Sequence, residues 1–244
     1  DVEVDLAPVF EKKGIGFRPS PATKVDPANN AITLEDGSTV TYDGGLAGQA
    51  VYPTSYGNLV INKSGGTQAF VNGAAVAFNN SLNIQAGSLW DNGAQIAGAF
   101  PATIVMGPNT LLTLGSGGVA TLFPTSVPAG NITFDSTSTV EYSSGAGIQQ
   151  ISPVPTYANL NVTTRGSGAT TKNLPGAQVL NINGNLDISN ASGTTTFGMG
   201  QDTVHVGLNV TGNGGIGFET TTGALNIGGS FLNTGSFVRD LSTV

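Results

Sequence analysis

The side chains of this sequence that can transfer a proton are few and widely spaced. In the second half of the chain, the charged candidates for such a site are Asp135, Glu141, Arg165, Lys172, Asp187, Asp202 and Glu219. Cleavage of a glycosidic bond requires two carboxyl groups that converge on that bond. Because these carboxylates occur singly, we predict that the chain has no catalytic residues and is not an enzyme.

Metal-binding side chains are equally sparse. His205 is the only histidine, and the chain has no cysteine. The alternation of Thr203-Val204-His205-Val206 places His205 on the polar side of a strand. A lone histidine without cysteines cannot supply the usual zinc ligand set, so we predict no metal site. The lack of cysteine also excludes a disulfide framework and a thiolate nucleophile.

One glycine pattern has the spacing of a phosphate-binding loop. Gly212-Asn213-Gly214-Gly215-Ile216-Gly217 fits G-x-G-x-x-G and follows the strand-like Leu208-Asn209-Val210. A dinucleotide fingerprint requires a helix to begin at its third glycine. The following residues 218–223 are a poor helix start, so we interpret the glycines as a tight corner and predict no cofactor.

Two interpretations of the aromatic residues remain open. Tyr52, Tyr56, Tyr157 and Trp90 can form a shallow carbohydrate-binding face. Alternatively, the tyrosines fill equivalent core or corner positions of a repeat. Asn58 and Asn159 also recur at matching positions, and we expect them to form a side-chain ladder or to close turns.

The repeat itself has an offset of about one hundred residues. Residues 31–42 align with 131–142, residues 53–61 align with 155–162, and residues 80–84 align with 184–188. Four of the five tyrosines lie in these paired segments. Internal repetition of this kind indicates a repetitive architecture.

Short alternating units recur between Gly, Asn, Pro and Ser residues, and each places two apolar side chains on one face. They are Leu59-Val60-Ile61, Leu82-Asn83-Ile84, Leu111-Leu112-Thr113-Leu114, Ile132-Thr133-Phe134, Leu160-Asn161-Val162, Leu186-Asp187-Ile188, Leu208-Asn209-Val210 and Leu225-Asn226-Ile227. Their starts lie about 17 to 29 residues apart, which is about one coil of a solenoid. We therefore predict an all-β chain that forms a β-solenoid resembling a parallel β-helix. A β-sandwich is the alternative.

Charge divides the chain near Asp43. Residues 1–43 carry 12 of the 23 charged side chains, whereas the remainder carries 11 and holds 33 of the 36 glycines. We predict a charged N-terminal region over 1–43, which is a cap, an arm or a fused segment, and a repetitive solenoid over 44–244. Within the first region we expect a short helix at 4–13, a strand at 15–17 and a β-hairpin that joins 31–34 to 39–42 through an Asp-Gly turn.

The overall composition restricts partners and location. Only 9% of residues are charged, and the net charge is −7. Nucleic-acid binding requires clustered Lys and Arg, which this chain lacks. No apolar run reaches the length of a membrane span. Solubility must rest on Asn, Ser, Thr and Gly, so we expect an extracellular or cell-surface protein.

Two segments resemble known families. Ser138-Thr139-Val140-Glu141-Tyr142, Tyr157-Ala158-Asn159-Leu160-Asn161-Val162 and Asn183-Gly184-Asn185-Leu186-Asp187-Ile188 resemble repeats of large secreted surface proteins of Bacteroidetes and related bacteria. This resemblance covers about 50–237. It implies stacked β-coils in adhesins, stalks and surface fibres.

The second resemblance lies at the N-terminal side. Asp1-Val2-Glu3-Val4-Asp5-Leu6-Ala7-Pro8-Val9-Phe10 and Leu34-Glu35-Asp36-Gly37-Ser38-Thr39-Val40-Thr41-Tyr42-Asp43 are similar to an internal stretch of sulfide:quinone oxidoreductase-like flavoproteins. In that family an Ala-Thr-Gly strand end that helps to bind flavin follows. Here Gly44-Gly45-Leu46 follows instead, and the redox cysteines are missing.

We therefore expect a structural extracellular surface protein, such as a fibre subunit or an adhesin stalk module. Its expected partners are copies of itself, neighbouring repeats of a larger surface protein and glycans. Assembly would use the strand edges at the ends of the solenoid. A carbohydrate-binding or carbohydrate-cleaving β-helix is the alternative.

Overall fold

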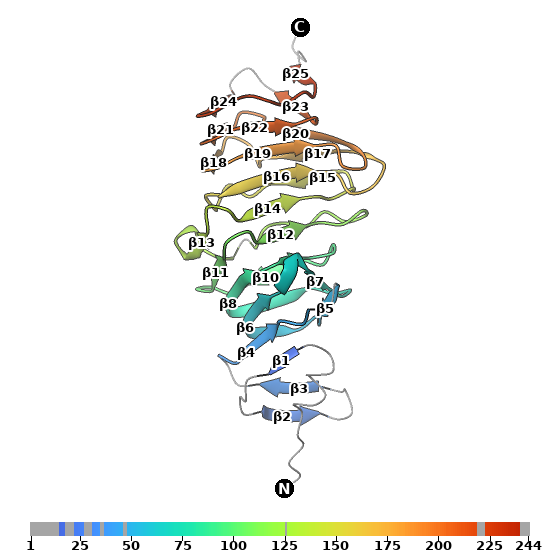
Figure 1. The fold of residues 1–244 in the computed structure, drawn as a ribbon, viewed down its shortest axis with the longest axis vertical. Coiled ribbons are helices and arrows are strands. Elements are labelled where there is room, and N and C mark those ends of the chain that lie inside the picture. The colour runs from blue at the N-terminus through green and yellow to red at the C-terminus, as the bar shows by residue number, and fades with distance from the viewer. Residues whose placement is uncertain are drawn as a thin grey trace.

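A computed structural model describes residues 15–17, 22–26, 31–34, 37–45, 48–124, 126–218 and 223–239. Over these residues the chain winds into a stack of short strands, with β2 and β3 near one end and β25 at the other (Figure 1). Each strand lies on the equivalent strand of the previous turn. The predicted β-solenoid is confirmed.

Two large sheets form two sides of the stack. The first contains β1 (Ile15–Phe17), β4 (Thr39–Tyr42), β6 (Ser55–Asn62), β8 (Val76–Ala86), β11 (Thr103–Met106) and β13 (Ile132–Phe134), with β10 (Ile96–Gly98) beside β8. The second has eight strands: β5 (Gln49–Val51), β7 (Gln68–Val71), β9 (Ser88–Trp90), β12 (Leu111–Leu114), β14 (Thr139–Tyr142), β16 (Asn159–Thr163), β19 (Leu186–Ser189) and β22 (Val210–Gly212). With one strand per turn, this second sheet spans eight turns.

Smaller sheets complete the C-terminal half. One contains β15 (Ile148–Gln150), β17 (Ala169–Asn173), β20 (Thr194–Gly198), β23 (Gly215–Phe218) and β25 (Phe237–Arg239). Another contains β18 (Val179–Ile182), β21 (Thr203–Val206) and β24 (Ala224–Ile227). The strands β2 (Ala22–Asp26) and β3 (Ala31–Leu34) pair separately, and the 3-10 helices η1 (Ser64–Gly66) and η2 (Ala129–Asn131) lie in connections.

Nearly all pairing between the described strands is parallel, and only β1 with β4 and β2 with β3 pair antiparallel. Parallel stacking of this kind excludes the β-sandwich alternative, which is built from antiparallel sheets. The register places apolar side chains on top of apolar side chains of the neighbouring turns. For example, Leu160, Leu186 and Val210 follow one another on β16, β19 and β22, and each is fully buried. These apolar rows form one continuous core along the stack.

The predicted strand units are real strands, but they do not all stack on one another. Leu59 and Leu82 lie in the first sheet, Leu160 lies in the eight-stranded sheet, and Leu225 lies on β24. One predicted unit is partly wrong. Strand β22 begins only at Val210, and Leu208 is exposed in the preceding turn, because the register pairs Val210 and not Leu208 with the core residue Leu186.

The two copies of the hundred-residue sequence repeat do not begin in the same sheet of the solenoid. From β4 the chain returns to the same sheet at β6, β8, β11 and β13, and β14 then lies in the eight-stranded sheet. One repeat therefore covers four turns plus one further side. Equivalent strands such as β4 and β14 therefore lie in different sheets although their sequences match.

The predicted hairpin between 31–34 and 39–42 is wrong in its pairing. Both segments are strands, but β3 pairs with β2, whereas β4 pairs with β1 on one edge and with β6 on the other. The parallel partner β6 places Leu59 and Ile61 beside Val40 and Tyr42, which extends the core and competes with a local hairpin. The strand at 15–17 is confirmed, and the helix expected at 4–13 lies outside the described residues.

The coil stack includes Thr39–Tyr42, so it begins on the N-terminal side of the composition boundary at Asp43. The described residues contain no helix that is long and apolar enough to cross a membrane.

Candidate functional site

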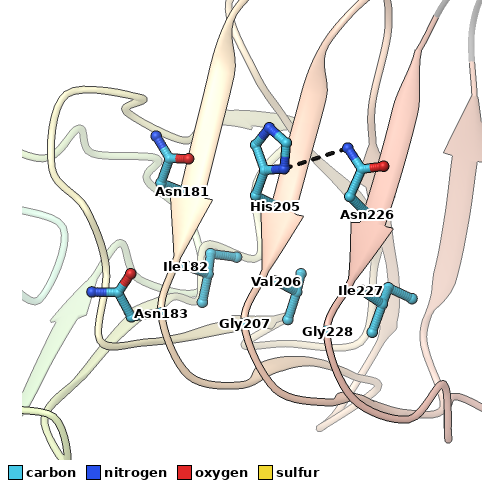
Figure 2. A pocket seen from close by; sticks show the side chains of 9 residues that line it. All are labelled: Asn181, Ile182, Asn183, His205, Val206, Gly207, Asn226, Ile227 and Gly228. Carbon is cyan, nitrogen blue, oxygen red and sulfur yellow. Dashed lines mark hydrogen bonds between the residues drawn. The ribbon is translucent and has the colours of Figure 1, made fainter.

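A shallow groove of about 360 Å³ lies on the sheet formed by β18, β21 and β24 (Figure 2). Asn181, His205 and Asn226 occupy the same register position on these three strands, so their exposed side chains stand in a row. The side-chain nitrogen of Asn226 lies 3.4 Å from His205 Nδ1. The prediction that His205 lies on the polar, exposed side of a strand is confirmed.

Glycines create the hollow beside this row. Gly207 and Gly228 directly follow β21 and β24. Asn183 has the equivalent position directly after β18. A Cβ atom on Gly207 would lie 2.2 Å from the carbonyl oxygen of Asn183, so the turns stack only without a side chain. The nine residues that line the groove include no carboxylate and no Phe, Tyr or Trp. Amide and imidazole groups of this kind can hydrogen-bond hydroxyl groups, but they supply no acid-base pair.

The glycine pattern at 212–217 is a corner, as expected. Strand β22 ends at Gly212, and Gly215 begins strand β23 rather than a helix. Gly212 has φ +108°, and a Cβ atom there would lie 2.0 Å from the carbonyl oxygen of Ile188. A helix N-terminus that could bind pyrophosphate is not formed at this position.

Two of the seven candidate charged residues lie on the same outer face of the eight-stranded sheet. Glu141 and Asp187 lie in one row on β14 and β19, with Asn161 of β16 between them. Two strand spacings separate them by about 10 Å. They are therefore on the same face, but they are not on adjacent turns, which agrees with their isolation in the sequence.

Each of these carboxylates bridges neighbouring strands. Glu141 accepts hydrogen bonds from the hydroxyls of Thr113 and Thr163 at 3.0 and 2.9 Å. Asp187 accepts hydrogen bonds from Thr211 at 2.8 Å and from Ser189 at 2.5 Å. Both oxygens of each carboxylate are engaged, so the arrangement links turns of the solenoid.

The remaining candidates are separated. Asp135 accepts hydrogen bonds from the backbone and hydroxyl of Thr137, which lower the pKa of its carboxyl. Asp202 accepts a hydrogen bond from the backbone of Gln178. Glu219 lies outside the described residues. Over the part of the chain that the structure describes, no three His, Asp or Glu side chains gather to hold a metal ion.

Arg165 contacts an aromatic ring rather than a carboxylate. Its guanidinium carbon lies 4.4 Å from the centroid of the Trp90 ring. The indole nitrogen of Trp90 donates a hydrogen bond to the carbonyl of Gly115 at 2.7 Å. One face of Trp90 and its donor are thus occupied, so this ring is poorly placed to stack on a sugar.

The tyrosines resolve the open choice between a sugar-binding face and equivalent corners. The hydroxyl oxygens of Tyr42 and Tyr56 lie 2.8 Å apart, and those of Tyr142 and Tyr157 lie 2.8 Å apart. All four side chains are buried, so the interpretation of Tyr56 and Tyr157 as part of a sugar-binding face is wrong, and the alternative of equivalent core or corner positions is confirmed for them. Of the aromatic residues proposed for that face, Tyr52 is strongly exposed.

The two corners match in detail. The backbone N–H groups of Tyr52 and Ser152 donate to the hydroxyls of Tyr42 and Tyr142 at 3.2 and 3.1 Å. The hydroxyl of Tyr56 donates to the carbonyl of Tyr52 at 2.6 Å, and the hydroxyl of Tyr157 donates to the carbonyl of Ser152 at 2.8 Å. We call each of these constellations a tyrosine corner. Burial raises the pKa of Tyr142 to about 12 and that of Tyr157 well above its usual value.

Two buried lysines were not expected from the sequence. Lys172 Nζ donates to the carbonyl of Ser144 at 2.6 Å and to the Thr170 hydroxyl at 2.8 Å. Lys63 Nζ donates to the carbonyl of Gly44, which is the repeat equivalent of Ser144. Burial lowers the pKa of Lys172 to about 8. The alternation of Lys172 with the inward residues Thr170 and Leu174 is the signal that could have placed it in the core.

The asparagine ladder is confirmed. Asn159 Oδ1 accepts a hydrogen bond from the backbone of Asn185 at 3.0 Å, and Asn185 Oδ1 accepts one from the backbone of Asn209 at 3.1 Å. Asn209 Oδ1 in turn accepts a hydrogen bond from the backbone of Ser230 at 2.9 Å. Asn58 instead bonds the carbonyl of Gly37 at 2.7 Å and so ties the first turns together.

Comparison of the chain with protein-family models, curated protein sequences and solved structures gave no match.

Proposed function

We propose that this chain is a structural module of an extracellular or cell-surface protein, and that it acts as a rigid stalk. The observation that carries the proposal is the continuous apolar core, which runs through the stacked turns and contains the same tyrosine corner twice. A solenoid of this kind derives its length from repetition, and its stiffness from backbone pairing between turns. The charge-poor surface of Asn, Ser, Thr and Gly supports an extracellular location.

The polar side chains support the same role. The asparagine ladder, Glu141 and Asp187 each connect neighbouring turns through hydrogen bonds. Side chains that link turns stabilise the stack and leave their functional groups satisfied. Under this proposal the chain is not an enzyme and binds no cofactor.

Strand edges at the ends of the stack can pair with further strands. Among the described strands, β1 is the outermost strand of the first sheet and β5 is the outermost strand of the eight-stranded sheet. The partners that we propose are neighbouring repeats of a larger surface protein and further copies of this chain, joined through strand edges.

Surface labelling of intact producing cells tests this function. Antibodies against the purified chain, followed by gold conjugates and electron microscopy, should label the cell exterior without permeabilisation. Mild protease treatment of the intact cells should remove the label. Label that appears only after permeabilisation would contradict the proposal.

The groove of Figure 2 favours a second candidate function, which is glycan binding. The row of Asn181, His205 and Asn226 presents hydrogen-bonding groups on an exposed surface. Hydroxyl-rich ligands bind through such groups. The engaged carboxylates Glu141 and Asp187 make cleavage a weaker proposal than binding.

A glycan array tests the second function. If the groove binds a sugar, the purified chain should retain specific glycans, and His205→Ala should abolish this retention. Asn161→Ala, on the outer face of another sheet, is the matched control and should leave it unchanged. No retained glycan, or equal loss in both variants, would count against the groove as a sugar site.

A further inference from the structure

Asparagine followed by glycine is the sequence in which an asparagine side chain most readily reacts with its own backbone. The chain contains four such pairs, which are Asn72-Gly73, Asn92-Gly93, Asn183-Gly184 and Asn213-Gly214. In the reaction, the backbone nitrogen of the glycine approaches the side-chain carbonyl carbon of the asparagine, and glycine has no Cβ atom to obstruct this approach. A hydrogen bond donated by the glycine N–H must break first. The fold therefore decides which pair can react.

Three of the four glycine amides are held by hydrogen bonds. The N–H of Gly93 donates to Asp91 Oδ1 at 2.9 Å. The N–H groups of Gly184 and Gly214 donate to backbone carbonyls of the preceding turn, both at 2.7 Å. Because these bonds fix the peptide nitrogen, the three pairs can react only after a local opening of the solenoid.

The same three glycines are also closely packed. A Cβ atom placed on Gly93, Gly184 or Gly214 would lie 2.6, 2.4 or 2.6 Å, respectively, from the nearest atom of a neighbouring turn. Rotation of these peptide units would bring them into collision with that turn. Packing thus protects the same pairs as the hydrogen bonds do.

The pair Asn72-Gly73 differs in both respects. It lies in the connection between β7 and β8, where residues 72–75 are all exposed. In the part of the chain that the structure describes, neither the Gly73 N–H nor the Asn72 side chain has a hydrogen-bond partner. A Cβ atom on Gly73 would meet no atom within 4 Å. Only the backbone N–H of Asn72 is anchored, by a hydrogen bond to the carbonyl of Val51 at 3.1 Å.

We propose that Asn72 is a site of spontaneous deamidation, and that it reacts fastest of the four Asn-Gly sites in the folded chain. A bond forms between the Gly73 nitrogen and Cγ of Asn72, and the bond between Cγ and the side-chain nitrogen breaks. The side-chain nitrogen leaves as ammonia and takes the proton of the Gly73 amide with it, so a succinimide ring remains. Water then adds to either carbonyl of the ring and opens it to aspartate or isoaspartate. No electrons are transferred to or from another molecule.

The product changes an uncharged part of the chain. Residues 64–90 contain no charged side chain, so the reaction places a single negative charge there. Isoaspartate also lengthens the backbone by one methylene group beside Val71, whose carbonyl accepts a hydrogen bond from the side chain of Asn92 at 3.3 Å. The modification accumulates with the age of the folded protein and alters this corner of the solenoid.

Peptide mapping by mass spectrometry tests the site. The folded chain is incubated in mildly alkaline buffer made with heavy-oxygen water, which labels only the deamidation that occurs during the incubation. Asn72 should convert about tenfold faster or more than Asn92, Asn183 and Asn213, because those three require local opening. In guanidinium chloride the four rates should become similar, since every site has the same following residue and the fold no longer protects any of them.

Two variants check the assignment on the intact protein. Asn72→Gln keeps the amide but requires a larger and slower-forming ring, so the acidic species that ion-exchange chromatography separates from the ageing natural chain should disappear. Asn183→Gln is the matched control at another exposed Asn-Gly site, and the acidic species should persist in it. Equal rates at the four sites of the folded chain, faster conversion at one of the other three, or an unreacted Asn72 under conditions in which the unfolded chain converts would each overturn the proposal.

Discussion

Tyr142 and Tyr157 meet in the core through their hydroxyl oxygens, 2.8 Å apart, with their rings in an edge-to-face arrangement at 71°. The pair closes a connection of the chain, because both hydroxyls also bond the backbone of Ser152. Tyr42 and Tyr56 repeat the arrangement one hundred residues earlier with the same distance and an angle of 78°. The repeated sequence thus encodes a repeated hydrogen-bonded corner.

Removal of one hydroxyl from a tyrosine corner should destabilise the fold. Tyr157→Phe leaves the carbonyl of Ser152 without this donor, and we expect a loss of about 1–2 kcal/mol in the free energy of unfolding. Urea denaturation followed by circular dichroism measures it. Tyr56→Phe should cost a similar amount in the first corner.

Tyr52→Phe is the control for both variants, since its side chain is 68% exposed. Its effect should stay within about 0.5 kcal/mol. The double variant Tyr142→Phe with Tyr157→Phe should cost less than the sum of the two single variants, because the hydroxyls are coupled. Strict additivity would contradict the corner as a coupled unit.

The buried Lys172 should make stability depend on pH. Its folded pKa of about 8 lies below the usual value of 10.5, so the unfolded chain binds more protons between these values. Stability should therefore rise as the pH increases from about 8, by an amount on the order of 2 kcal/mol across the window. Burial raises the pKa values of Tyr56, Tyr142 and Tyr157, so stability should fall again above about pH 10.

Lys172→Met isolates the lysine contribution. Urea midpoints at pH 7.0, 8.5 and 9.5 should rise more steeply for the natural chain than for this variant, which keeps only the contribution of Lys63, whose pKa burial also lowers. At pH 7 the variant should be as stable as the natural chain or more so, because a buried charge is removed. An identical rise with pH in both proteins would show that Lys172 does not titrate as described.

The buried Asp91 should act as a structural acceptor. It accepts hydrogen bonds from the backbone of Gly93 at 2.9 Å, from the backbone of Gly115 at 2.8 Å and from the Thr121 hydroxyl. Asp91→Ala leaves these donors unpaired and should cost about 2–4 kcal/mol, whereas Asp91→Asn keeps the main acceptor oxygen and should cost less than half as much. Thermal unfolding of both variants measures the difference. Equal losses would contradict this role.

The asparagine ladder should stabilise the second half of the stack. The side-chain oxygen of Asn185 accepts hydrogen bonds from the backbone and from the side-chain amide of Asn209, both at 3.1 Å, so Asn185→Ala removes this rung and should cost about 1–2 kcal/mol. Asn181→Ala removes an exposed asparagine from the neighbouring strand β18 and should change stability by less than about 0.5 kcal/mol. Hydrogen exchange at the backbone amide of Asn209 should accelerate only in the first variant.

Local patterns predicted much of the fold. Strand segments such as Leu160-Asn161-Val162 and the recurrence of Tyr142 and Asn159 follow from alternation and self-similarity. The pairing of strands was harder to predict. The Asp-Gly turn before β4 is a hairpin signal, but β4 pairs in parallel with β6, which extends the core. The residues of a local turn carry no information about a strand partner that lies further along the chain.

The candidate surface was predicted less completely. Alternation placed His205 on the outside of its strand, but the sequence does not show that Asn181 and Asn226 stand beside it, since their spacing depends on the length of each turn. Tyr56 and Tyr157 were ambiguous for another reason. Tyrosine suits both a sugar-binding surface and a buried hydrogen-bonded pair, and only the partner hydroxyl distinguishes the two.

Negative-stain electron microscopy of the purified chain over a concentration series tests the central claim most directly. The account predicts elongated rods of uniform width and length. Compact round particles at every concentration would contradict the rigid stalk.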